Sequence, residues 1–160
     1  MEPDPRSFKI LLHNIEMSAL RQRVLLINAA VGACKGSIKL KLADNPSESS
    51  ASDYLNDSRV VGVVEVPMIS LDEIFKSQEL KRVDVIKIDV EGSGSDVVAG
   101  AKLVLSRFRP HMIFEVHRGY ESDEVTTIKT LKREYNYECR ILEFRNKRNF
   151  LIHLVPKVGK

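Results

Sequence analysis

The segment Val83–Ala101, VDVIKIDVEGSGSDVVAGA, places an apolar run directly before two carboxylates and a glycine-rich turn. The run is short and rich in β-branched residues, which indicates a buried strand, and a helical pattern follows the turn. Similar strand-like and helix-like segments alternate along the whole chain. This alternation is typical of an α/β protein with a mostly parallel sheet that helices cover on both faces. In such sheets, ligands bind where strands end at their carboxyl side.

The hydrophobic periodicity predicts the order of the elements. Strands are expected over residues 23–32, 36–43, 60–69, 83–90, 112–117, 137–144 and 149–155, and helices over 5–20, 71–75, 97–108 and 122–135. Ser70 and Glu73 have the spacing of a capping box at the second helix. The last two strands are expected to close as an antiparallel hairpin. Residues 1–160 contain no repeat and no boundary between domains, so we expect a single domain.

Composition excludes several classes of protein. The net charge of +3 is spread over the chain, so a nucleic-acid-binding face is not expected. Cys34 and Cys139 are isolated, without the spacing of a zinc site. The first residues lack the apolar core of a signal peptide, and no run approaches the roughly 20 apolar residues of a membrane span. The sequence therefore predicts a cytoplasmic protein.

Two neighbouring strands end in polar side chains that could form a site. Asp89 and Glu91 share one face where the strand within 83–90 ends, and Glu115 and His117 share one face of the strand 112–117. A purely structural role remains an alternative for each pair. A carboxylate before a helix is often only a cap or a solvated loop residue, and a histidine at a strand end is often structural.

The same segments carry a resemblance to a known family. VDVIKIDVEGSGSDVVAGA, followed by RPHMIFEVH, resembles the FkbM family of S-adenosylmethionine-dependent methyltransferases. Three further segments resemble that family in the same order and spacing: EPDPRSFKILLHNI, INAAVGACKGSIKL and ISLDEIF. The resemblance implies a Rossmann-like sheet of the class I methyltransferases. It also implies transfer of a methyl group from S-adenosylmethionine to a hydroxyl of a sugar, lipid or secondary metabolite.

The resemblance implies four cofactor-binding residues. Glu2 matches the acid that accepts hydrogen bonds from the ribose hydroxyls, a task suited to a bidentate acceptor. Asn28 and Ala29 match the positions beside the adenine, where an amide can bond the ring edge and a small side chain leaves room. Asp89 matches the acid near the methionine part of the cofactor and the transferred methyl. Glu2 as a frayed terminus and Asn28 as a turn residue remain alternatives.

The resemblance also implies the acceptor side of the reaction. Glu115 and His117 match the end of the family's fifth strand, beside the acceptor. An acceptor hydroxyl is a poor nucleophile at neutral pH and benefits from a general base. His117, Asp89 and Glu115 are the candidates for that base, and no metal is expected.

Two departures from the family are visible. Gly94 stands where the family usually has an acid. The chain also begins where the family's second strand ends, so the first strand and its glycine-rich loop have no counterpart here. We therefore expect the chain as given to bind S-adenosylmethionine weakly or not at all, and to be a fragment, a mis-started frame or a decayed relative. Exposed strand edges of such a sheet could also pair with another chain.

Three alternatives belong to other classes. A non-catalytic remnant would retain the core pattern without the cofactor loop. A metal enzyme could use Asp89 and Glu91 as oxygen ligands, although the sequence offers no further cluster at suitable spacing. A nucleic-acid-binding module would rely on the basic residues 145–148, for which a solvated turn is the simpler interpretation.

Overall fold

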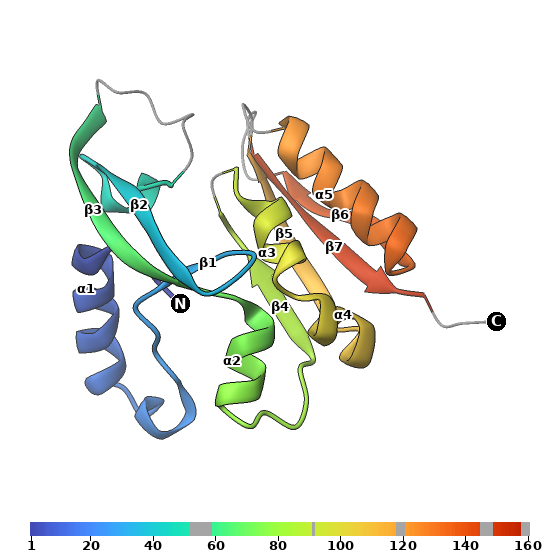
Figure 1. Cartoon of the computed structure of the whole chain (residues 1–160), viewed down its shortest axis with the longest axis horizontal. Coiled ribbons are helices and arrows are strands. Elements are labelled where there is room, and N and C mark those ends of the chain that lie inside the picture. Colours follow the sequence, from blue (N-terminus) through green and yellow to red (C-terminus); the bar gives the residue numbers. More distant parts are fainter. Residues whose placement is uncertain (52–58, 91, 118–120, 145–148, 158–160) are drawn as a thin grey trace.

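A computed structural model gives the structure of residues 1–51, 59–90, 92–117, 121–144 and 149–157 (Figure 1). The helices are α1 (Pro5–Glu16), η1 (Arg21–Arg23), η2 (Pro46–Glu48), α2 (Leu71–Ser77), α3 (Gly94–Ala99), α4 (Lys102–Phe108) and α5 (Glu121–Glu134). The strands are β1 (Ala30–Val31), β2 (Gly36–Ala43), β3 (Val60–Ile69), β4 (Val85–Ile88), β5 (His111–His117), β6 (Tyr137–Phe144) and β7 (Asn149–Pro156). No helix within these ranges is long and apolar enough to cross a bilayer.

The strands form two sheets, with the orders β1-β3-β2 and β4-β5-β7-β6. The α/β class and the antiparallel hairpin β6–β7 are confirmed. The prediction of a mostly parallel sheet is wrong, because only β1–β3 and β4–β5 pair in parallel among the described strands. The pairs β2–β3, β5–β7 and β6–β7 are antiparallel. Among the described elements, β3 is the next strand after β2 and β7 is the next strand after β6, and consecutive strands commonly pair antiparallel.

The strand predicted over residues 23–32 is almost absent. Only Ala30 and Val31 pair with β3, while Val24 and Leu25 are 37% and 55% exposed. An apolar run becomes a strand only when a neighbouring strand satisfies its backbone groups. In the described part of the chain, residues 24–28 have one such backbone partner, the Glu2 N–H that donates to the Ile27 carbonyl at 3.1 Å.

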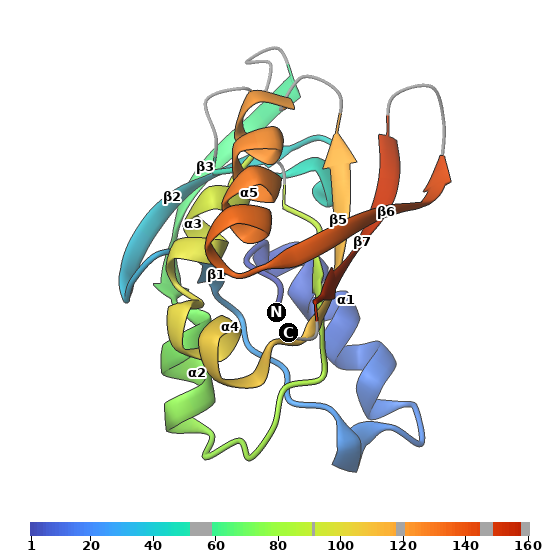
Figure 2. The same cartoon turned by 90° about the vertical axis from the view of Figure 1, so that its right-hand side faces the viewer.

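The main core lies between the four-stranded sheet and helices α3, α4 and α5, which share one face of that sheet (Figure 2). Its largest fully buried members are Tyr137, Phe114, Leu105, Met112, Leu131, Ile152 and Leu154. The predicted helix 97–108 is two helices, α3 and α4, which part at Gly100. A Cβ at Gly100 would lie 2.1 Å from the carbonyl oxygen of Gly32, so this close approach requires glycine.

Side chains satisfy the first turns of α2 and α4, and the sequence predicted the first of these. Ser70 and Glu73 form the predicted capping box of α2. Asp72, in the first turn of α2, accepts the N–H groups of Leu103 and Val104 at 2.9 and 3.0 Å. Its carboxylate thereby satisfies the first turn of α4, whose N–H groups have no partner within the helix.

Strand β4 is buried on one face only. Ile88 belongs to the core and Ile86 packs against it, whereas Val85 is 59% exposed, contrary to its predicted burial. Side chains alternate between the two faces of a strand. Lys87 and Asp89 therefore share the outer face with Val85, and this alternation places a cation and a carboxylate side by side where β4 ends.

Candidate functional site

Charged side chains converge where the parallel strands β4 and β5 end. Ile88 pairs with Phe114, which brings the next residue, Asp89, beside Glu115. Glu115 and His117 are 5% and 6% exposed, although they lie on the sheet face that points away from the core helices. The structure thus brings Asp89, Glu115 and His117 together, as the sequence predicted. Glu91 lies outside the described residues.

The three side chains and Lys87 form one cluster of charges. His117 Nε2 lies 3.5 Å from Asp89 Oδ1 and 3.9 Å from Glu115 Oε1. The Lys87 ammonium forms an ion pair with Asp89 and lies 3.8 Å from Glu115 Oε2. Burial raises the pKa of Asp89, but Lys87, the nearby His117 and a hydrogen bond with Glu115 outweigh it, so this pKa is lowered. Asp89 is therefore an anion at neutral pH.

Glu124 on α5 is a member of the site that sequence reasoning missed. Its side chain is fully buried, and Oε2 accepts the backbone N–H of His117 at 2.7 Å. Oε1 lies 3.2 Å from His117 Nδ1. One signal was available in the sequence: Glu124 occupies the helical face of Ile128 and Leu131, which pack in the core. An acid on an apolar face needs a buried partner.

The cluster also has the donor atoms of a cation site. Ligand atoms of Asp89, Glu115 and His117 lie within 4.8 Å of one another. The sequence offered no such cluster at suitable spacing, because the fold brings together residues that lie far apart in the chain. Two carboxylates and an imidazole can hold a divalent cation. The Lys87 ammonium already lies against both carboxylates, so a metal ion could enter only if Lys87 moved away.

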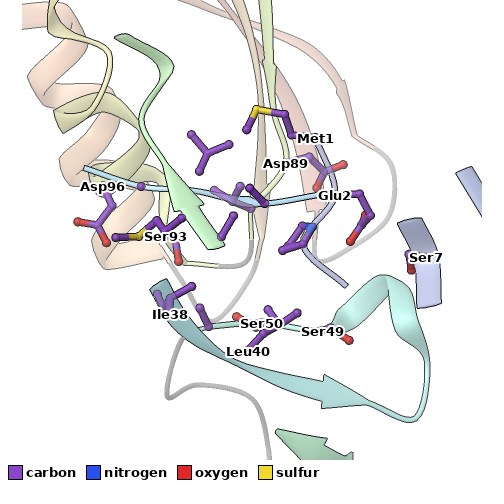
Figure 3. A pocket seen from close by; sticks show the side chains of 18 residues that line it. Met1, Glu2, Ser7, Ile38, Leu40, Ser49, Ser50, Asp89, Ser93 and Asp96 are labelled. Carbon is purple, nitrogen blue, oxygen red and sulfur yellow. The ribbon is translucent and has the colours of Figure 1, made fainter. Parts of the chain in front are cut away.

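A cavity of about 390 Å³ opens beside Asp89 (Figure 3). Residues that line it include Glu2, Ala29, Gly32, Leu40, Ser49, Met68, Asp89, Ser93 and Asp96. Glu2 and Asp89 lie at one side of the cavity, and Ser93 and Asp96 lie at the opposite side (Figure 3). This volume suits a small-molecule ligand, since such sites enclose roughly 300–1,000 Å³. Three predicted site residues, Glu2, Ala29 and Asp89, thus share one cavity.

The side-chain amide of Asn28 binds the backbone of the N-terminal segment, which differs from its predicted place beside an adenine. Its Nδ2 donates to the backbone carbonyls of Glu2 and Pro3, at 2.8 and 3.4 Å. Glu2 Oε1 accepts the Asp4 N–H at 2.8 Å. Burial raises the pKa of Glu2, although the Asp4 N–H partly offsets this. Asn28 therefore holds the segment that carries Glu2, and Ala29 is the member of the predicted adenine pair that lines the cavity.

Asp4 connects two walls of the cavity. Its carboxylate is 1% exposed and accepts hydrogen bonds from the Arg6 guanidinium and the Ser49 hydroxyl, both at 2.7 Å. Burial opposes the charge, but Arg6 and Ser49 outweigh it and lower the pKa of Asp4 to about 2. Asp4 also caps α1 by accepting the Arg6 N–H. The network joins the start of α1 to the η2 loop.

Two glycines shape the turn between Asp89 and α3. Gly92 has a φ of 74°, a left-handed conformation that side chains rarely adopt. A Cβ at Gly94 would lie 2.7 Å from Cζ of Phe114, so α3 can pack on β5 only with glycine here. The acid that the family usually has at this position would not fit this packing.

An α/β fold whose cavity and charged cluster lie where parallel strands end is the arrangement of an α/β enzyme. Comparison with known proteins gives the particular family. A sequence model of the methyltransferase FkbM domain matches residues 1–144. The chain belongs to the FkbM methyltransferase family.

Two known proteins are similar to this chain. The hexuronic acid methyltransferase AglP of Haloferax volcanii is 26% identical over 127 residues, which cover 79% of this chain and 50% of that protein. The crystal structure of the methyltransferase FkbM from Methylobacillus flagellatus KT has the same fold, with a TM-score of 0.63 at 14% identity. That comparison covers 96% of this chain and 35% of the other. The chain thus spans half or less of the length of these relatives.

Proposed function

We propose that this chain carries the cofactor and catalytic site of an S-adenosylmethionine-dependent O-methyltransferase that acts on a sugar. The observation that carries the proposal is that Glu2, Ala29 and Asp89 line one cavity. Asp89 also belongs to the charged cluster with Glu115 and His117. The family membership supports methyl transfer. The named sugar substrate of the relative AglP supports a glycan acceptor.

The donors around the cavity fit such a cofactor. Glu2 offers a carboxylate that can accept two hydrogen bonds from a ribose diol, and its backbone is held by Asn28. Ala29 is small enough to leave room for an adenine ring. Asp89 is an anion that can face the positive sulfonium and amino groups. The bound cofactor would supply a methyl group that is already activated by its positive sulfur.

The protein's part in the reaction is orientation and proton transfer. His117 Nε2 is the group that would accept the proton of the acceptor hydroxyl. Asp89 and Glu115, at 3.5 and 3.9 Å from this nitrogen, favour the imidazolium that forms. Lys87 balances their charge, so the cluster does not hold two unpaired carboxylates.

Binding of S-adenosylhomocysteine tests the proposed cofactor site. Glu2→Gln should raise the Kd about tenfold, because hydrogen bonds to a charged group contribute roughly 1.5–3 kcal/mol. Titration calorimetry measures tight binding, and NMR shift perturbation measures binding that is weak. Glu16→Gln makes the same chemical change in the exposed last turn of α1 and should bind like the wild type. Absence of binding by the wild type would favour the non-catalytic remnant.

Asp89→Asn tests the contribution of the negative charge at the point where the proposed cofactor cavity meets the cluster of Glu115 and His117. We expect methyl transfer to fall by at least about tenfold, or ~1.4 kcal/mol of transition-state stabilisation, with little change in melting temperature. The side chain is 43% exposed, so its loss costs little packing. Asp84→Asn, just before β4, is the matched control. Unchanged transfer with a lower melting temperature would instead make Asp89 a structural residue.

A further inference from the structure

We propose that Glu124 is a positioning residue for the methyl transfer: its buried carboxylate holds the His117 ring with the proton on Nδ1 and leaves Nε2 to receive the acceptor's proton. The inference rests on the proposed function in assigning His117 as the base. The resemblance did not include Glu124, and its position on the apolar face of its helix was not used to predict the site.

Burial gives the first argument. A fully buried carboxylate is costly unless hydrogen bonds compensate for the lost water. In the described part of the chain, both Glu124 oxygens meet nitrogens of His117: Oε2 accepts the backbone N–H at 2.7 Å, and Oε1 lies 3.2 Å from Nδ1. Glu124 therefore contacts both the backbone and the ring of His117, and the ring cannot rotate without loss of a contact.

The chemistry of the donors gives the second argument. The backbone N–H always donates, so it fixes Oε2 as its acceptor. An ionised carboxylate accepts only, so Oε1 requires the proton on Nδ1. In a neutral imidazole with Nδ1 protonated, Nε2 carries the lone pair. This nitrogen faces Glu115 and Asp89, and Asp89 lines the cavity.

The proton balance follows from this arrangement. The acceptor hydroxyl would give its proton to Nε2 as its oxygen forms the new bond to the methyl carbon. The methyl–sulfur bond of S-adenosylmethionine would break in the same step, S-adenosylhomocysteine would be the leaving group, and His117 would become an imidazolium. Glu124, Asp89 and Glu115 lie beside that ring, and the Lys87 ammonium faces Asp89 and Glu115. After product release the proton leaves Nε2 for water, and Nδ1–H remains bonded to Glu124. The positive charge that the sulfonium loses appears on the imidazolium, so atoms and charge balance with the acceptor and S-adenosylmethionine as the reactants.

Histidine ¹⁵N NMR of the 160-residue chain tests the proposal. At a pH where the ring is neutral, wild-type His117 should show a protonated Nδ1 and an unprotonated Nε2. In Glu124→Gln, the amide oxygen should retain the backbone N–H, and the amide NH₂ should then donate to Nδ1. The tautomer should therefore invert to Nε2–H, which cannot act as the base through Nε2.

The matched control is Glu134→Gln, the same change on an exposed residue of α5, which should leave the His117 signals in place. Amide spectra of each variant check the fold. An Nε2–H tautomer in the wild type, or unchanged ring signals in a folded Glu124→Gln protein, would overturn the proposal. If Glu124→Gln does not fold, the wild-type tautomer alone decides.

These spectra need neither cofactor nor acceptor, so they separate this inference from the proposed function. Wild-type protein with the Nδ1–H tautomer but without methyl transfer would contradict the function and leave the positioning of the ring established. Methyl transfer by a protein with the Nε2–H tautomer would support the function and contradict the positioning role of Glu124.

Discussion

Replacing His117 by alanine is expected to lower the rate of methyl transfer to a hydroxyl by at least about 100-fold, since a positioned general base contributes about 10²–10⁴-fold. The geometry that supports this is the ring of charges around Nε2, with Asp89 at 3.5 Å and Glu115 at 3.9 Å. The assay follows labelled methyl transfer from S-adenosylmethionine to a methyl glucuronoside, at saturating concentrations of both.

His111→Ala is the matched control for this variant. His111 begins the strand that His117 ends, is exposed, and hydrogen-bonds with His153 at 2.8 Å. The control should keep wild-type activity. A drop of similar size in both variants would assign the effect to strand β5 as a whole, and wild-type activity of His117→Ala would exclude His117 as the base.

The chemical nature of the product sharpens this experiment. A hexuronic acid offers hydroxyls and a carboxylate, and a carboxylate is already ionised at neutral pH. Methylation of the carboxylate needs no base, so its rate should not depend on His117. Mild alkali cleaves the resulting methyl ester and leaves a methyl ether intact. If His117→Ala forms an alkali-labile product as fast as the wild type does, the methylated group is a carboxylate and not a hydroxyl.

Local patterns in the sequence predicted most elements and part of the site. The capping box of Ser70 and Glu73 depends on residues three positions apart, so it could be predicted with no knowledge of the fold. The placement of Asp89 near Glu115 followed from a general property of adjacent parallel strands, whose carboxyl ends meet. Both predictions needed only the local pattern and the order of elements.

Features that depend on long-range pairing could not be predicted in this way. The apolar run 23–32 looks like a strand, but most of it finds no strand partner in the described residues. The partners of Asn28 lie 25 and 26 residues away along the chain, so its amide could not be assigned from neighbouring residues. Glu124 was missed for a different reason. Its helix was predicted, but an acid on a core-facing position has meaning only once the ring of His117 is placed beside it.

The second large effect concerns stability. Asp4→Asn is expected to lower the free energy of unfolding at neutral pH by about 2 kcal/mol, because the folded pKa of about 2 lies below the ordinary value of 3.8. Asparagine is as good an N-cap as aspartate, so the cap of α1 should survive and the lost term is the charge. The figure allows for Arg6, which is 36% exposed and partly screened by water.

The sign of the pH dependence distinguishes this charge from other causes of instability. A carboxyl whose folded pKa is lowered stabilises the protein fully above its unfolded pKa, and this contribution is lost as the pH falls through the folded value. The difference between wild type and Asp4→Asn should therefore be complete at neutral pH and shrink toward about pH 2. Urea denaturation at both pH values measures it, with Asp84→Asn, at a 61% exposed ion pair, as the control.

Because Asp4 joins α1 to Ser49 in the cavity wall, the variant should also bind S-adenosylhomocysteine less tightly. A stability difference that persists unchanged in acid would show that packing around position 4, and not its charge, holds the two walls together.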